Sequence, residues 1–128
     1  MIPARWPDVT LMTLDYLRPL HPDVVFTRTK RPDVDAQVVV DSEPQQLETD
    51  LSRRVTVLLE SWVTLPNKSA DVHASFELMT DVLFDLQQAP KKIRRVVRFD
   101  SPIGPRVVRD DLKFEYHEGS ITLVVSPV

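Results

Sequence analysis

Three histidines are the side chains of this sequence best suited to acid–base or metal chemistry, and they lie far apart along the chain. His21, His73 and His117 show no spacing typical of metal ligands, and no HExxH motif is present. Serine and aspartate also occur, but no GxSxG motif marks a nucleophile. The sequence therefore predicts no catalytic residue, no metal site and no cofactor. We expect His73 to face solvent and His117 to be either an interface group or a plain surface position.

Segment 99–111, FDSPIGPRVVRDD, contains one of only two glycines in the chain. The GxGxxG and GxxxxGK motifs of phosphate-binding loops are absent. Prolines also lack the backbone N–H that would bind an anion. We interpret residues 101–111 as a rigid loop between two strands that projects from the sheet and contacts another protein. The candidate contact residues are Pro102, Ile103, Gly104, Pro105 and Arg106.

Aspartates near this segment offer a further candidate site. Asp100, Asp110 and Asp111 could bind a divalent cation, but the EF-hand pattern is absent. A solvated turn is the interpretation that we favour for these residues.

Charged residues gather in two segments of opposite sign. Residues 41–50 contain four acidic residues and no basic one: Asp41, Glu43, Glu48 and Asp50. Residues 91–109 contain seven basic residues against one acidic residue. The basic residues are Lys91, Lys92, Arg94, Arg95, Arg98, Arg106 and Arg109. A solvated face or a protein contact is favoured over a nucleic-acid site here, because Phe99 is the only aromatic residue among them and the net charge is −3.

Two helices and several strands must position these groups. Asp8 is a plausible cap for a first helix, and Asn67 or Ser69 for a second, which ends at Pro90. The second helix carries an apolar stripe that we expect in the core: Val72, Phe76, Met79, Leu83 and Leu86.

Strands are predicted at 23–29, 35–41, 53–64 and 93–99, and in the segment from residue 112 to the end. Residues 41–50 are predicted to be a loop, with one helical turn as an option. Within the last strand segment, Phe114 and Tyr116 are out of phase with Ile121, Leu123 and Val125. Either a bulge at Gly119 that puts both sets on one face or a tight turn there would account for the change.

The order of elements predicts one α+β domain over residues 1–128. We expect a mainly antiparallel sheet of about four to five strands, with two helices packed on one face. The chain has no cysteine and no run of about 18 apolar residues, so neither a disulfide nor a membrane-spanning helix is expected. Arg5 and Asp8 interrupt the stretch where a secretory signal would be apolar.

The layout resembles the tail terminator (minor tail, or tail completion) proteins of long-tailed siphophages, particularly those that infect actinobacteria. The likeness is one of pattern and covers nearly the whole chain. It rests on the segments LRPLHPDV, VTVLLESWVT, ADVHASFELMTDVLFDL, SPIGPRVVRDD and FEYHEGSITLVV. The Gly104–Pro105 dipeptide, followed by acidic residues and the last strand, is the nearest feature to a motif.

This resemblance implies a structural virion protein and no enzyme. Such proteins form a ring, typically a hexamer, at the head-proximal end of the tail, after assembly in the host cytoplasm. The ring stops polymerisation of the major tail tube protein and presents a surface to the head–tail connector. Contact with DNA in the channel would be transient and non-specific. A head-completion or neck adaptor ring protein, and a small enzymatic or ligand-binding domain of a cellular protein, are the alternatives.

A ring of this kind needs two complementary patches on each subunit. We expect Asp41, Glu43, Glu48 or Asp50 of one subunit to lie near Arg94, Arg95, Arg98 or Arg106 of the next. Ordinary solvated surface is the alternative for both segments.

Overall fold

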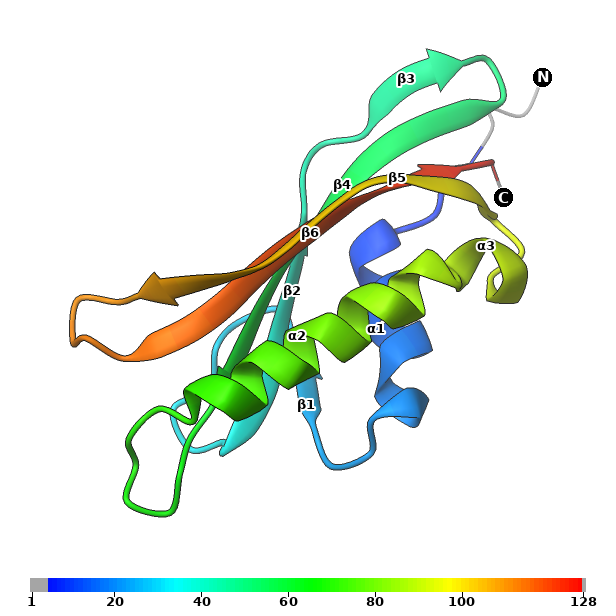
Figure 1. Cartoon of the computed structure of the whole chain (residues 1–128). Helices are drawn as coiled ribbons and strands as arrows, with labels where there is room; N and C mark the ends of the chain where they lie inside the picture. The colour runs from blue at the N-terminus through cyan, green and yellow to red at the C-terminus, as the bar shows by residue number, and fades with distance from the viewer. Residues whose placement is uncertain (1–4, 128) are drawn as a thin grey trace.

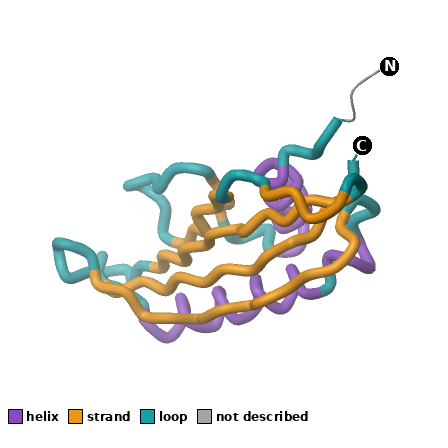
Figure 2. Tube along the Cα trace, turned by 90° about the horizontal axis from the view of Figure 1, so that it is seen from above, coloured by secondary structure: helices purple, strands orange, loops and turns teal. Residues whose placement is uncertain are grey.

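The computed structural model describes residues 5–127 and contains one mixed sheet with helices on one face (Figure 1). The helices are α1 (Val9–Leu17), the 3-10 turn η1 (Arg18–Leu20), α2 (Val72–Gln87) and the short α3 (Ala89–Lys92). The strands are β1 (Val25–Thr27), β2 (Ala36–Ser42), β3 (Gln46–Thr49), β4 (Ser52–Val63), β5 (Val96–Arg109) and β6 (Glu115–Val125). Figure 2 shows the strands as one layer and the helices as a second. The predicted α+β class is confirmed.

The sheet has six strands. Five of them lie side by side in the order β1-β2-β4-β6-β5, and the sixth, β3, pairs with β4. β1 and β2 run parallel, and every other pair is antiparallel. β4 is central, since it pairs with β2 and β3 as well as with β6. Its alternating apolar residues Val55, Val57 and Leu59 are all buried on the face that the helices cover. The predicted antiparallel character is thus confirmed, with more strands than expected.

Both long helices begin at an aspartate. The Asp8 side chain accepts a hydrogen bond of 3.0 Å from the Leu11 N–H, as predicted. α2 is capped by Asp71, which accepts from the Ala74 N–H at 3.0 Å. The prediction of Asn67 or Ser69 as the cap was wrong. The Asn67 side chain instead accepts the N–H of Ser69 within the preceding turn.

The core fills the space between the sheet and the helices. Three of the five residues in the apolar stripe predicted for α2 belong to it. Met79, Leu83 and Leu86 are buried, whereas Val72 is 37% exposed and Phe76 is 45% exposed. Ser75 takes the inward position near the start of the helix. Other fully buried side chains come from α1 and three strands: Leu17, Val38, Val40, Val57, Ile121 and Leu123.

The acidic segment 41–50 is not a loop with a helical turn. Its second half forms β3, which pairs antiparallel with the start of β4 as a hairpin. Leu47 of β3 lies on the exposed arm of this hairpin and is 70% exposed.

The last strand has neither a turn nor a bulge at Gly119. β6 pairs with β4 without interruption, and Gly119 lies opposite Leu59. Residues of even and odd number therefore stay on opposite faces of the sheet. Tyr116 stacks on Trp62 on the face without helices, with ring centroids 3.8 Å apart, while Ile121 lies in the core.

Residues 101–111 do not form a loop that projects from the sheet. β5 continues through them to Arg109 and stays paired with β6, with register shifts on either side of Ile103. Prolines are tolerated there because β5 is the last strand of the sheet and only one of its edges is paired. The turn that does project from the sheet joins β5 to β6 beyond Asp110 (Figure 1).

Candidate protein-interaction surfaces

The three histidines are held by different elements and do not converge. His21 Nε2 lies 2.5 Å from Asp85 Oδ2, and this contact joins the end of η1 to α2. His73 faces solvent, as predicted, with its Nε2 2.8 Å from Glu77 Oε1. Within residues 5–127, no group of three histidine, aspartate or glutamate side chains could hold a metal ion.

His117 is buried, which contradicts both positions that the sequence suggested for it. Its Nδ1 lies 2.6 Å from Ser75 Oγ, and the Ser61 hydroxyl donates to the Ser75 carbonyl at 2.8 Å. Ser75 and Ser61 are fully buried, and burial lowers the pKa of His117. The pair resembles a nucleophile with its base, but a fully buried Ser75 hydroxyl cannot meet a substrate. We interpret it as a polar link that fixes α2 on β4 and β6.

The three aspartates on β5 and in the turn after it also have structural positions that the sequence left open. Asp100 Oδ2 accepts a hydrogen bond of 2.8 Å from Arg54. Asp110 Oδ1 accepts the N–H groups of Leu112 and Phe114 at 2.9 and 2.8 Å, which makes it the organising residue of the turn. The solvated-turn interpretation fits Asp110 and Asp111, and Asp100 belongs to an ion-pair network.

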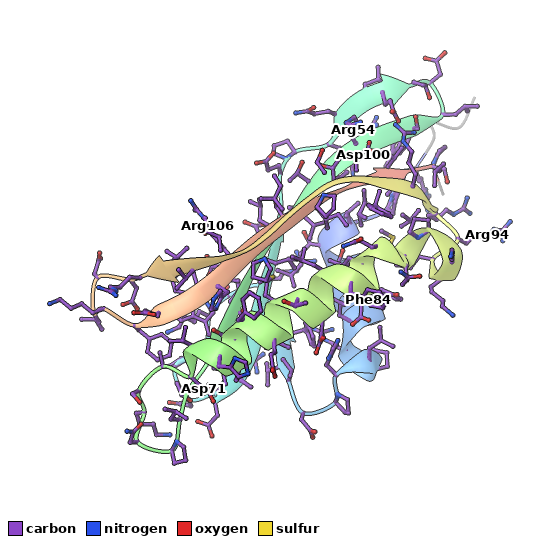
Figure 3. All side chains as sticks on the ribbon, viewed as in Figure 1. Arg54, Asp71, Phe84, Arg94, Asp100 and Arg106 are labelled. Atoms are coloured by element: carbon purple, nitrogen blue, oxygen red, sulfur yellow. The ribbon has the colours of Figure 1, made fainter. Side chains whose placement is uncertain are left out.

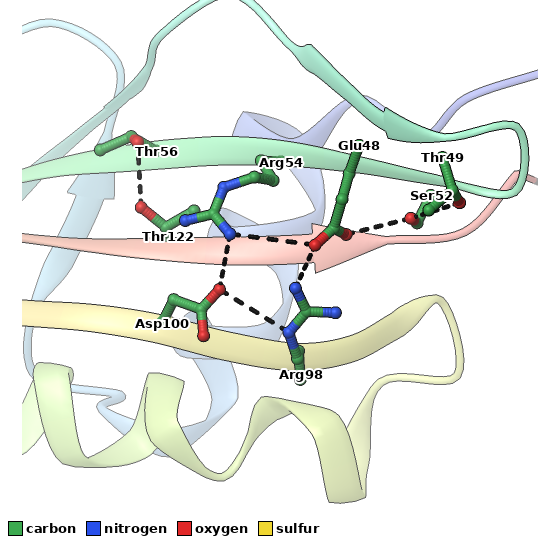
Figure 4. A network of polar contacts seen from close by, with 8 residues as sticks. All are labelled: Glu48, Thr49, Ser52, Arg54, Thr56, Arg98, Asp100 and Thr122. Carbon is green, nitrogen blue, oxygen red and sulfur yellow. Dashed lines mark hydrogen bonds and ion pairs between the residues drawn. The ribbon is translucent and has the colours of Figure 1, made fainter.

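That network brings the acidic and basic segments together within a single chain (Figure 4). Glu48 of β3 pairs with Arg98 of β5 and lies 3.9 Å from Arg54 of β4. Asp100 Oδ2 lies 2.8 Å from Arg54 Nη1 and 3.7 Å from Arg98 Nε. Val124 lies between Arg54 and Arg98 in the strand register and is fully buried, so the two arginines cover it.

Two other predicted interface arginines are also engaged within the chain. Arg106 pairs with Glu118 on the neighbouring strand, and Arg95 donates to the Pro127 carbonyl at 2.7 Å. By contrast, four of the predicted interface residues are exposed and have no ion-pair partner in the described part of the chain. These are Asp41, Glu43, Asp50 and Arg94. Their contact with another subunit stays a prediction.

The predicted contact residues of β5 lie on the free edge of the sheet. Pro102, Ile103 and Gly104 are exposed, and Pro105 is half-buried. Ile103 and Arg106 line a shallow depression of about 470 Å³ on the face without helices, together with Leu58 of β4. Five charged residues line it: Arg28 pairs with Asp8, Arg106 pairs with Glu118, which also lines the depression, and Glu60 accepts the Trp62 indole N–H. The fifth, Asp41, is exposed and has no ion-pair partner in the described part of the chain. The depression is therefore lined by charges of both signs, most of which are held by partners within the chain.

Exposed aromatic side chains on α2 are the feature that sequence reasoning missed. Phe84 is 62% exposed and Phe76 nearly half exposed, on a helix whose other face is in the core (Figure 3). The signal was present, since Val72, Phe76, Thr80 and Phe84 recur every four residues. The predicted core stripe includes Val72 and Phe76 of this set, and it leaves out Thr80 and Phe84.

The ion-pair network predicts that the pKa of the Glu48 carboxyl is lowered. The hydrogen bond from Arg98 holds the pKa of this carboxyl below its ordinary value of 4.5. A lowered carboxyl pKa stabilises the fold above pH 4.5, and that contribution is lost as pH falls through the lowered value. We expect NMR titration to place the Glu48 pKa below 4.5, and Arg98→Ala to return it toward 4.5.

Arg94→Ala is the matched control, because Arg94 is exposed and lies outside the network. It should leave the Glu48 pKa unchanged. A Glu48 pKa that does not respond to Arg98→Ala would show that the two side chains are not paired in solution.

Within residues 5–127, no helix combines the length and apolar character needed to cross a membrane. No protein-family model and no curated protein sequence matches this chain.

Proposed function

We propose that this protein is a structural subunit of a homo-oligomeric ring, typically a hexamer, that terminates the tail tube of a long-tailed phage and joins the tail to the head. The observation that carries the proposal is the exposure of large apolar side chains on separate surfaces of a small domain. Phe84 lies on α2, Ile103 on the β5 edge, and Leu47 and Leu51 on the β3–β4 hairpin. Each of these surfaces carries more than one such side chain, since Phe76 joins Phe84 on α2, and Val97 and Val107 join Ile103 on β5. Exposed apolar side chains that gather on one surface are typical of proteins that pack against other proteins.

The arrangement of polar groups supports a structural role over an enzymatic one. The three histidines, Asp100 and Asp110 are engaged in ion pairs, a buried hydrogen bond and a turn, and the histidines do not converge on one site. The resemblance of the sequence to tail terminator proteins supplies the partners: copies of the same chain, the tail tube protein and the head–tail connector.

Two measurements test the proposal. The mass of the purified protein in solution should rise with concentration from that of a monomer, 14.7 kDa, toward that of a closed ring. Negative-stain images of the protein mixed with tail tubes should show density at one end of each tube. Binding to the portal side of the head, with bare tube ends, would favour a neck adaptor. A monomer at every concentration that binds neither structure would contradict both ring assignments.

A further inference from the structure

The α2 helix presents an acidic and aromatic surface to solvent. Phe76 and Phe84 lie two turns apart, and Glu77 and Asp81 are exposed between them. Residues 71–88 contain no lysine or arginine. We call this the α2 surface and define it by Phe76, Glu77, Asp81 and Phe84. Exposed aromatic rings beside acidic groups fit a partner that is apolar at its centre and basic at its rim.

A hollow with that complementary character lies between α1 and the start of β5. Its volume is about 570 Å³. We call it the α1 hollow and define it by Leu11, Met12, Tyr16, Lys92, Ile93 and Arg94, which line it. Leu11 is 45% exposed, so the hollow has an apolar floor that solvent can reach.

Charge in the α1 hollow is basic once the pairs within the chain are taken into account. The two acids that also line it, Asp8 and Asp15, pair with Arg28 at 3.1 Å and with Arg18 at 3.5 Å. Lys92 and Arg94 are exposed, and neither forms an ion pair within residues 5–127. Arg94 projects from the end of the molecule that carries α3 (Figure 3).

The two surfaces do not overlap, because α2 carries one and α1 with the α3–β5 connection carries the other. On one flank the Tyr16 hydroxyl donates to the Asp85 carbonyl at 2.9 Å, so this flank faces α1. On the other flank the Phe76 ring meets the His117 ring edge to face, with centroids 5.7 Å apart. His117 is the register partner of Val107 on β5, so this flank faces the free edge of the sheet. Two unlike surfaces that do not overlap on one subunit allow head-to-tail association.

We propose that the α2 surface of one copy docks into the α1 hollow of the next copy. Phe84 and Phe76 pack against Leu11 and Ile93, and Asp81 and Glu77 face Arg94 and Lys92. The inference rests on the proposed function, because it assumes that copies of the chain assemble. It places the acidic side of this interface on α2, whereas Glu48 of the acidic segment already pairs with Arg98 in its own chain.

Disulfide trapping tests the contact directly, because the chain has no cysteine of its own. Phe84→Cys and Leu11→Cys are made as separate proteins, and both positions are exposed, so both variants should fold. Oxidation of the mixed proteins should give a disulfide-linked dimer of unlike chains, since a disulfide requires Cα atoms within about 7 Å. The double variant should give a ladder of linked multimers. Leu47→Cys mixed with Phe84→Cys is the control and should give no such product.

Charge reversal provides an independent measurement of the same contact. Asp81→Lys or Arg94→Glu alone should each weaken association by about tenfold, and the two changes together should recover most of it. Asp111→Lys is the matched control, because Asp111 is an exposed acid at the β5–β6 turn. Sedimentation at low salt reads out the association, and the effect should shrink at 1 M salt, where the screening length is about 3 Å.

The possible outcomes distinguish a failure of this interface from a failure of the proposed ring. The protein could assemble and cap tail tubes, form no disulfide between positions 84 and 11, and associate equally well with Asp81→Lys or Arg94→Glu. That result would overturn the interface and leave the proposed function intact. A link between two Phe84→Cys chains in place of the 84–11 link would overturn head-to-tail packing. A wild-type protein that is monomeric at every concentration and does not bind tubes would overturn both proposals.

Discussion

Replacing Leu86 by alanine should lower the free energy of unfolding by about 2–5 kcal/mol. Leu86 is fully buried near the C-terminal end of α2, where its side chain belongs to the core between the helices and the sheet. Removing it leaves a cavity that the surrounding side chains fill only in part. Urea denaturation of the wild type and the variant, at a protein concentration where both are monomeric, gives the difference.

Phe76→Ala is the informative comparison, because the sequence alone would assign both residues to the same core stripe. Its ring is 45% exposed and makes its edge contact with His117, so we expect a loss below about 1 kcal/mol. The larger side chain should therefore matter less to folding than the smaller one. Equal losses for the two variants would show that Phe76 is buried in solution and is not available to a partner.

The spacing of apolar residues predicts the α2 helix but identifies only part of its buried face. Apolar spacing identified Met79, Leu83 and Leu86 because the sheet beneath them is apolar. Near the start of the helix, the sheet presents Ser61 and His117, so a polar residue, Ser75, faces inward. Ser75 and His117 are 42 positions apart in the sequence, and no local pattern connects them.

Strand β5 shows why proline and glycine misled the prediction of a loop. Both residues weaken a central strand, but an edge strand leaves one row of its backbone groups unpaired and tolerates proline. Whether a strand is at the edge depends on the order of strands in the sheet, which becomes known only once β5 is placed outside β6. The alternating pattern of β4 needed no such information, since both of its edges are covered by other strands.

The sequence predicts that the two segments of opposite charge meet across a subunit interface, whereas the structure pairs Glu48 with Arg98 within one chain. That pairing depends on the topology of the sheet. Glu48 lies on β3 and Arg98 on β5, and β4 and β6 between them bring both onto one face of the sheet. Pairing within the chain removes these two residues from the set available to a neighbouring subunit. The prediction for α2 used only its apolar residues, so it did not include the exposed acids Glu77 and Asp81.

Gly104→Ala should destabilise the fold by about 1–3 kcal/mol from backbone strain alone. Gly104 has a φ of +107°, a conformation that residues with a side chain rarely adopt. A Cβ atom there would lie 2.7 Å from the Glu118 carbonyl oxygen and 2.9 Å from the Gly119 Cα. The only two glycines in the chain thus pack against each other where the register between β5 and β6 shifts. Both obstructing atoms belong to the backbone of β6, so they cannot move aside as a flexible side chain would.

Ile103→Ala is the matched control for this position, because it changes the preceding residue, whose side chain is 61% exposed. We expect it to cost less than about 1 kcal/mol. Chemical denaturation compares the two variants, and amide hydrogen exchange along β5 and β6 shows where pairing is lost. In Gly104→Ala, exchange should accelerate around residues 103–106 and 118–120, while the paired ends of the two strands stay protected. A Gly104→Ala protein as stable as Ile103→Ala, with unchanged exchange at these positions, would mean that β5 is not held against Gly119 and that the edge of the sheet is free to adopt another register.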